Sequence, residues 1–99
     1  MPPATVSPAA VPGAVRLDRL PRNTPATVLE VLPLGHPEDR ERVLRLTEIG
    51  FVPGESVRVV AYGFPGREPI AVRVGRSTFA LRAHEAALVS VAPSVKAVR

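Results

Sequence analysis

Apolar and polar residues alternate along much of the chain with the period of two that is typical of β-strands with one buried face. The strands that this alternation and the β-branched residues predict are 26–32, 55–62, 70–74, 78–82 and 88–91. In the second of them, Val57, Val59 and Ala61 take alternate positions and should face the same way. Pro33 ends the first.

A helix is predicted over 37–49, where the apolar period changes to three or four residues. A proline occupies its first position and Gly50 follows its last residue, which are the usual start and stop signals. Leu46 should lie on its buried stripe. Leu44 points away from that stripe, so we expect it to be exposed.

Charged residues suit the predicted helix in two ways. Glu38 and Asp39 lie in its first turn, where negative charge complements the helix dipole. Glu38 with Arg42, and Glu41 with Arg45, have the i,i+4 spacing of favourable ion pairs. These carboxylates therefore have a structural explanation and need no catalytic one.

The elements predict a mainly β fold: a small, partly open barrel of five strands. One helix follows the first strand, and a short helical turn at 83–87 precedes the last. The 99 residues are enough for one domain. We assign 16–92 to that domain, 1–15 to a flexible tail rich in Pro and Ala, and 93–99 to a short C-terminal tail.

The charge balance first suggests a polyanionic partner, since the sequence pI is about 11.0 and the formal net charge is +4. However, 16–92 contains eleven arginines and all nine acidic residues, and arginine raises a calculated pI strongly. Arg58 and Arg73 should face outward on neighbouring strands. The chain has only three Phe and one Tyr, a thin platform for stacking bases, so we expect no nucleic-acid partner.

Several function classes lack the residues that they need. The chain has no Cys, which excludes disulfides and thiol nucleophiles, and it has no nucleophile elbow or phosphate-binding loop. We therefore expect a protein that is not an enzyme. No apolar run approaches the roughly 20 residues of a membrane span, and the N-terminus does not resemble a signal peptide. The expected location is the cytoplasm, without membrane insertion.

Metal binding has a few candidate ligands, namely His36, Glu38 and His84. A preformed transition-metal site normally takes three or four ligands, and neither histidine has enough potential ligands beside it in the sequence. We therefore expect no resident metal or cofactor. Weak binding, or binding shared with another molecule, stays open.

The segment 45–57 reads Arg-Leu-Thr-Glu-Ile-Gly-Phe-Val-Pro-Gly-Glu-Ser-Val and resembles the signature of the FeoA family, Arg-Leu-x-x-Leu-Gly-Leu-x-Pro-Gly. The resemblance continues in order through 69–74 and 80–82 and covers about 17–92. Ile49 and Phe51 replace the common leucines.

This resemblance implies an SH3-like fold and a cytosolic accessory role in bacterial ferrous iron uptake. Its implied partner is the cytosolic part of FeoB, a membrane transporter with a GTPase domain that could recruit the protein to the inner membrane. Similar barrels end the iron-dependent repressors of the DtxR type. The alternative reading is therefore a domain that binds or senses Fe(II) or another divalent metal.

For a partner-binding surface we select the exposed side of the helix and the turn after it. An exposed apolar side chain beside charges is typical of a surface that meets another protein. The selected residues are Leu44, Arg45, Glu48, Phe51 and Pro53.

Overall fold

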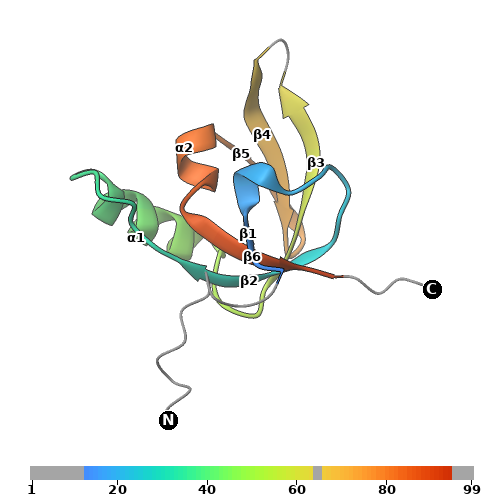
Figure 1. The fold of residues 1–99 in the computed structure, drawn as a ribbon, viewed down its shortest axis with the longest axis horizontal. Helices are drawn as coiled ribbons and strands as arrows, with labels where there is room; N and C mark the ends of the chain where they lie inside the picture. The colour runs from blue at the N-terminus through green and yellow to red at the C-terminus, as the bar shows by residue number, and fades with distance from the viewer. Residues whose placement is uncertain (1–12, 64–65, 95–99) are drawn as a thin grey trace.

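The computed structural model describes residues 13–63 and 66–94, with Arg67 described by its backbone alone. The tails predicted at 1–15 and 93–99 lie largely outside these residues, so their flexibility stays a prediction. The described residues form one antiparallel sheet, with two α-helices next to each other at one side of it (Figure 1).

The sheet has six strands in the order β1-β6-β2-β3-β4-β5, and every neighbouring pair is antiparallel. The strands are β1 (Val15–Arg16), β2 (Ala26–Val31), β3 (Ser56–Gly63), β4 (Arg67–Val74), β5 (Ser77–Leu81) and β6 (Val89–Pro93). The sheet does not close, because β1 and β5 lie at its two edges. The prediction of a mainly β, partly open barrel is confirmed.

The number of strands differs from the five predicted, because β1 forms a sixth. Val15 pairs with Val91 and Arg16 pairs with Ser90. Two residues are too few to show an alternating pattern, so only their pairing with a distant strand reveals them. The sheet thus begins one residue inside the stretch assigned to the N-terminal tail.

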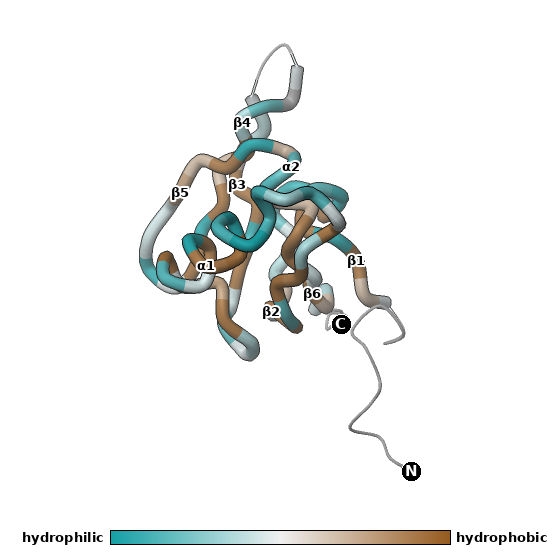
Figure 2. The backbone as a smooth tube through the Cα atoms, turned by 90° about the vertical axis from the view of Figure 1, so that its left-hand side faces the viewer, coloured by the Kyte–Doolittle hydropathy of each residue, from teal (hydrophilic) through white to brown (hydrophobic). Residues whose placement is uncertain are grey.

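The hydrophobic core is one cluster that combines alternate positions of the strands with side chains from the connections. Figure 2 shows hydrophobic segments along the inner strands. Among the buried side chains outside the strands are Leu17 and Leu20, around the 3-10 helix Leu17–Arg19, and Leu46 and Phe51, each at most 1% exposed. Burial of each of these side chains contributes about 1.5–3 kcal/mol to the free energy of unfolding. The four residues therefore hold the connections against the sheet.

The register of β3 differs from the predicted alternation. Val57 and Val59 are buried as expected, but the pairing with β4 shifts between Val59 and Ala61. This β-bulge places an extra residue in β3. Ala61 is consequently exposed rather than buried with the two valines.

Helix α1 (Asp39–Ile49) begins two residues later than predicted, because Pro37 and Glu38 form a turn before it. It ends at Gly50, whose φ of 135° few other residues adopt. The helical period is confirmed, since Leu46 is fully buried and Leu44 is 60% exposed. A second helix, α2 (Ala83–Ala86), is the predicted helical turn before the last strand.

Candidate partner-binding surface

The loop before α1 is held by the carboxylate of Asp39, which is 1% exposed. Asp39 Oδ2 accepts the backbone N–H of Leu34 at 2.7 Å and that of His36 at 3.2 Å. These bonds, first that from Leu34, lower the pKa of the Asp39 carboxyl below its ordinary value, although burial acts in the opposite direction. Asp39 therefore does more than complement the helix dipole, because it ties the loop to the first turn.

The ion pairs of α1 differ from those predicted. Arg42 Nη1 lies 3.0 Å from Asp39 Oδ1, at i,i+3, and that is the ion pair it makes instead of one with Glu38. Arg45 pairs with Glu85 of α2 rather than with Glu41. Arg42 thus pairs with the buried Asp39 of its own helix, and Arg45 pairs with a residue of another helix.

Glu85 joins α1 to α2, a structural role that the sequence did not reveal. It is 7% exposed, and its Oε1 accepts the backbone N–H of Arg82 at 2.9 Å. Its other oxygen, Oε2, meets Arg45. The capping position is occupied by Arg82 instead of Ser or Thr, so the sequence lacks the usual capping-box signal.

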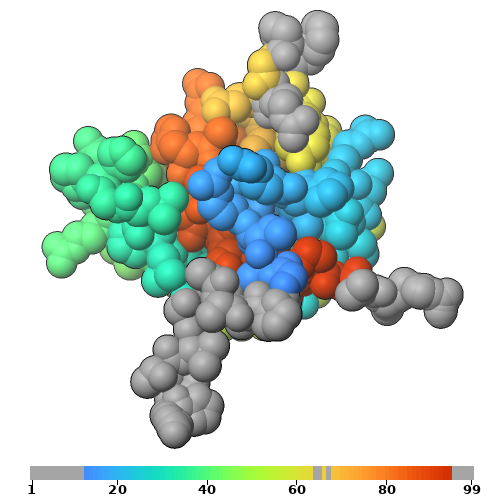
Figure 3. Space-filling view, viewed as in Figure 1, coloured from blue at the N-terminus to red at the C-terminus, as the bar shows by residue number. Residues whose placement is uncertain are grey.

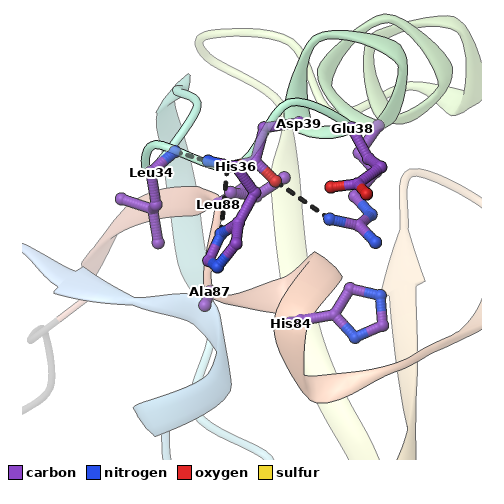
Figure 4. A pocket seen from close by; sticks show the side chains of 8 residues that line it. Leu34, His36, Glu38, Asp39, His84, Ala87 and Leu88 are labelled. Carbon is purple, nitrogen blue, oxygen red and sulfur yellow. Dashed lines mark hydrogen bonds and ion pairs between the residues drawn. The ribbon is translucent and has the colours of Figure 1, made fainter.

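A pocket of about 340 Å³ opens between the loop before α1, α1 itself and α2 (Figure 4). Leu34, Ala87 and Leu88 give it an apolar side, and its other lining residues are charged or carry imidazoles. The full lining is Leu34, His36, Glu38, Asp39, Arg42, His84, Ala87 and Leu88. The pocket can therefore take an apolar group beside charged ones.

All three predicted metal-ligand candidates, His36, Glu38 and His84, line this pocket although they come from distant parts of the sequence. In Figure 4 the two imidazoles enter from the loop before α1 and from α2. Nevertheless, no three His, Cys, Asp or Glu residues within the described part of the chain are grouped so that they could hold a metal ion. The residues present do not fit a preformed metal centre.

The predicted surface residues lie on and just after α1, which projects at one side of the molecule next to α2 (Figure 3). Leu44, Glu48 and Pro53 are exposed. Arg45 is also accessible, with 57% of its side chain exposed, but the pair with Glu85 holds its guanidinium. The four predicted residues that are exposed therefore all come from the segment 44–53.

Phe51 does not belong to this surface. It is 1% exposed and packs in the core with Leu46, so its side chain cannot touch a partner. Gly50 turns the chain sharply at the end of α1, and this turn directs the next side chain inward. The prediction of Phe51 as a contact residue is wrong.

Other exposed apolar residues near α1 were missed by sequence reasoning. The large hydrophobic side chains that are exposed in the described residues all fall between positions 32 and 52. They are Leu32 at 43%, Leu34 at 53%, Leu44 at 60% and Val52 at 37%. The predicted strand 26–32 and its proline stop gave no reason to expect an exposed leucine on either side of Pro33.

The FeoA domain, as a protein family, matches residues 15–93 of this chain. The chain belongs to the FeoA family. A FeoA from Stenotrophomonas maltophilia is 48% identical with a TM-score of 0.69, and the match covers 78% of this chain and 88% of that one. It was crystallised in complex with zinc and is described as an SH3 domain protein and a candidate ferrous iron transport activating factor.

Two more solved structures extend the FeoA comparison. FeoA from Chlorobium tepidum is 25% identical with a TM-score of 0.67, covering 85% of this chain and 74% of that one. A manganese-dependent transcriptional repressor is 21% identical with a TM-score of 0.68, covering 84% of this chain and 43% of the repressor. The repressor shows a likeness of fold alone. The SH3-like fold implied by the FeoA signature is thus confirmed.

No curated protein matches this FeoA-family chain by sequence. Across residues 13–63 and 66–94, no helix has both the length and the apolar character to cross a bilayer.

Proposed function

We propose that this FeoA-family chain is an accessory protein of bacterial ferrous iron uptake. It catalyses no reaction; it is a cytoplasmic interaction module that binds the cytosolic part of a FeoB-type GTPase transporter at the inner membrane. Family membership supports this role, and so does the transport-activating role suggested for the relative from S. maltophilia.

The observation that supports a binding role best is that the large apolar side chains exposed in the described residues all come from positions 32–52, on α1 or close to it in the sequence. Exposed apolar side chains that form a contiguous patch commonly mark a site where another molecule binds. Leu34 and Leu44 are each more than half exposed, on the loop before α1 and on α1. They provide an apolar centre, and Glu48 and Arg45 provide charged neighbours.

The surface is held in place before a partner arrives. Asp39 bonds to the backbone of Leu34, and Glu85 holds Arg45. A surface ordered in advance loses less conformational entropy on binding. Leu34, Leu44, Arg45, Glu48 and Pro53 form the contact surface that we propose.

The test is a titration of the full chain with the purified cytosolic part of a FeoB-type transporter. Leu44→Glu should weaken binding about tenfold or more, because it puts a charge into the apolar centre of the contact. Its melting temperature should stay close to that of the wild type, because Leu44 is exposed. Ala61→Glu places the same charge at an exposed position of β3 and is the matched control.

Unchanged affinity in Leu44→Glu would remove this surface from consideration. Absence of binding by the wild-type chain would contradict the proposed partner itself.

Divalent-metal binding is the second candidate function. His36, Glu38 and His84 line one pocket, and the relative from S. maltophilia was solved with zinc. Because the described residues form no three-ligand centre, a metal here would need a further ligand from another molecule. Anaerobic calorimetry with Fe(II) and with Zn(II), on the wild type and on His36→Ala and His84→Ala, tests this. Micromolar binding that both variants lose would favour metal binding by this chain, and absence of heat would exclude it for the chain alone.

A further inference from the structure

Two arginines lie directly opposite each other on the outer face of the β3–β4 hairpin. Arg58 pairs with Arg73 in the register, and both are exposed, as the alternation predicted. Side chains at directly opposed positions project from the same face with Cβ atoms about 4.5–5.5 Å apart. Like charges at such positions destabilise a sheet, so this pair has a cost that calls for an explanation.

Neither arginine is neutralised within the described part of the chain. Arg16, Arg42, Arg45 and Arg82 each have a carboxylate partner there. None of the described ion pairs or side-chain hydrogen bonds includes Arg58 or Arg73. Their guanidinium groups remain available to a ligand from outside.

A surface hollow of about 200 Å³ lies beside the two arginines. Its lining is Pro25, Ser56, Val57, Arg58, Arg73 and Gly75. Ser56 is exposed and supplies a hydroxyl, and Gly75 has no side chain to fill the space. Thr78 of β5 stands opposite Arg73 on its other side and adds a second exposed hydroxyl. The side-chain donors that line the hollow are therefore Ser56, Arg58 and Arg73, and Thr78 lies next to Arg73 outside the lining.

The small size of the positively charged area around Arg58 and Arg73, and the residues at its border, indicate which kind of ligand it binds. A nucleic acid needs a stripe of cations that follows its regularly spaced phosphates. Here the cations are flanked by uncharged Ser56 and Thr78, and the Glu55 carboxylate lies close to Gly75, 3.5 Å from the position of an added Cβ. A negative group at that rim opposes a continuous polyanion. Two guanidinium groups instead match a single carboxylate, which accepts charge-assisted hydrogen bonds from both.

We propose that Arg58 and Arg73 form a binding site for a carboxylate on an acidic segment of a protein partner. The site shares no residue with the contact surface around α1, and it does not depend on FeoB being the partner. The bound carboxylate would supply the negative charge that the two arginines do not receive from the described residues.

The experiment is an NMR titration of the ¹⁵N-labelled full chain at low ionic strength with acetyl-Gly-Gly-Glu-Gly-Gly-amide, a blocked peptide that carries a single carboxylate. The amides of Ser56 and Gly75 and the side-chain Nε–H groups of Arg58 and Arg73 should shift. Arg58→Gln and Arg73→Gln should each weaken binding about tenfold, since a hydrogen bond to a charged group contributes that much or more. Arg40→Gln removes the same charge from an exposed position of α1 and should bind like the wild type.

Parallel titrations distinguish the other ligands. Oligothymidylate or inorganic phosphate that binds at these amides as tightly as the peptide would overturn the choice of a carboxylate partner. Peptide shifts that scatter over the surface, or that persist in the double variant Arg58→Gln/Arg73→Gln, would overturn the site. Leu44→Glu should leave peptide binding unchanged, so failure of one proposal is separable from failure of the other.

Discussion

Arg45 of α1 forms an ion pair with Glu85 of α2, and this pair connects the two helices beside the pocket. The two partners are unequal, since 57% of the Arg45 side chain is exposed and only 10% of the Glu85 side chain is. Glu85 also accepts the backbone N–H of Arg82. The carboxylate is therefore the structural member of the pair, and the guanidinium is the accessible one.

Glu85→Ala should lower the free energy of unfolding by about 1–3 kcal/mol, because it leaves the Arg82 amide without its acceptor and removes a nearly buried charge partner. Arg45→Gln should lower it by less than about 1 kcal/mol, as is usual for an exposed ion-pair partner. Urea denaturation of both variants measures whether Glu85→Ala loses more unfolding free energy than Arg45→Gln. Equal losses in the two variants would contradict this division of roles.

Asp39 should make stability depend on pH. Its folded-state pKa is lowered, so its contribution is fully present above its unfolded pKa, about 3.9, and is lost as the pH falls toward the folded value. Asp39→Asn should therefore be less stable than the wild type at pH 7, and the difference should narrow below about pH 4. Glu41→Gln, an exposed acid of the same helix, is the charge control. A difference that stays constant from pH 7 to pH 3 would count against the role of Asp39.

Phe51 and Leu44 should respond differently to truncation, although Leu44 lies in the middle of α1 and Phe51 only two residues after its end. Phe51→Ala should cost about 3–5 kcal/mol of unfolding free energy, because it opens a cavity in the core. Leu44→Ala should change stability by less than about 0.5 kcal/mol, because its side chain is exposed. Thermal unfolding of the two variants measures this contrast, and a loss of less than about 1 kcal/mol in Phe51→Ala would contradict the burial of Phe51.

Gly50→Ala should destabilise the domain by about 1–3 kcal/mol, because φ at this position is 135° and side chains disfavour it. An added Cβ would meet only Val74 Cγ2 at 3.8 Å, so the cost is conformational rather than steric. Gly66→Ala, where nothing lies within 4 Å of the added Cβ, is the control and should be close to neutral. Equal stabilities of the two variants would argue against strain at Gly50.

Features that depend on local periodicity were predictable from the sequence. The burial of Leu46 and the exposure of Leu44 follow from the helical period, and the outward position of Arg58 and Arg73 follows from alternation. The FeoA signature at 45–57 likewise identified the family and with it the SH3-like fold.

Features that depend on distant partners were not predictable. The pair of Arg45 with Glu85 joins residues 40 positions apart in the sequence, and β1 exists only because β6 lies beside it. Asp39 looks like an ordinary first-turn acid until the loop folds back and places two amides on its carboxylate.

Strand β6 is the last strand of the sheet to be synthesised, yet it lies between β1 and β2. Val91 pairs with Val15 on one side and with Val28 on the other, so these contacts span most of the domain. Such pairing requires closure of long loops, and domains with this topology fold in roughly milliseconds to seconds rather than microseconds. A nascent chain that ends before Val89 leaves β1 and one edge of β2 without a partner, which exposes strand edges to aggregation. The strand order thus makes completion of the chain a condition for folding.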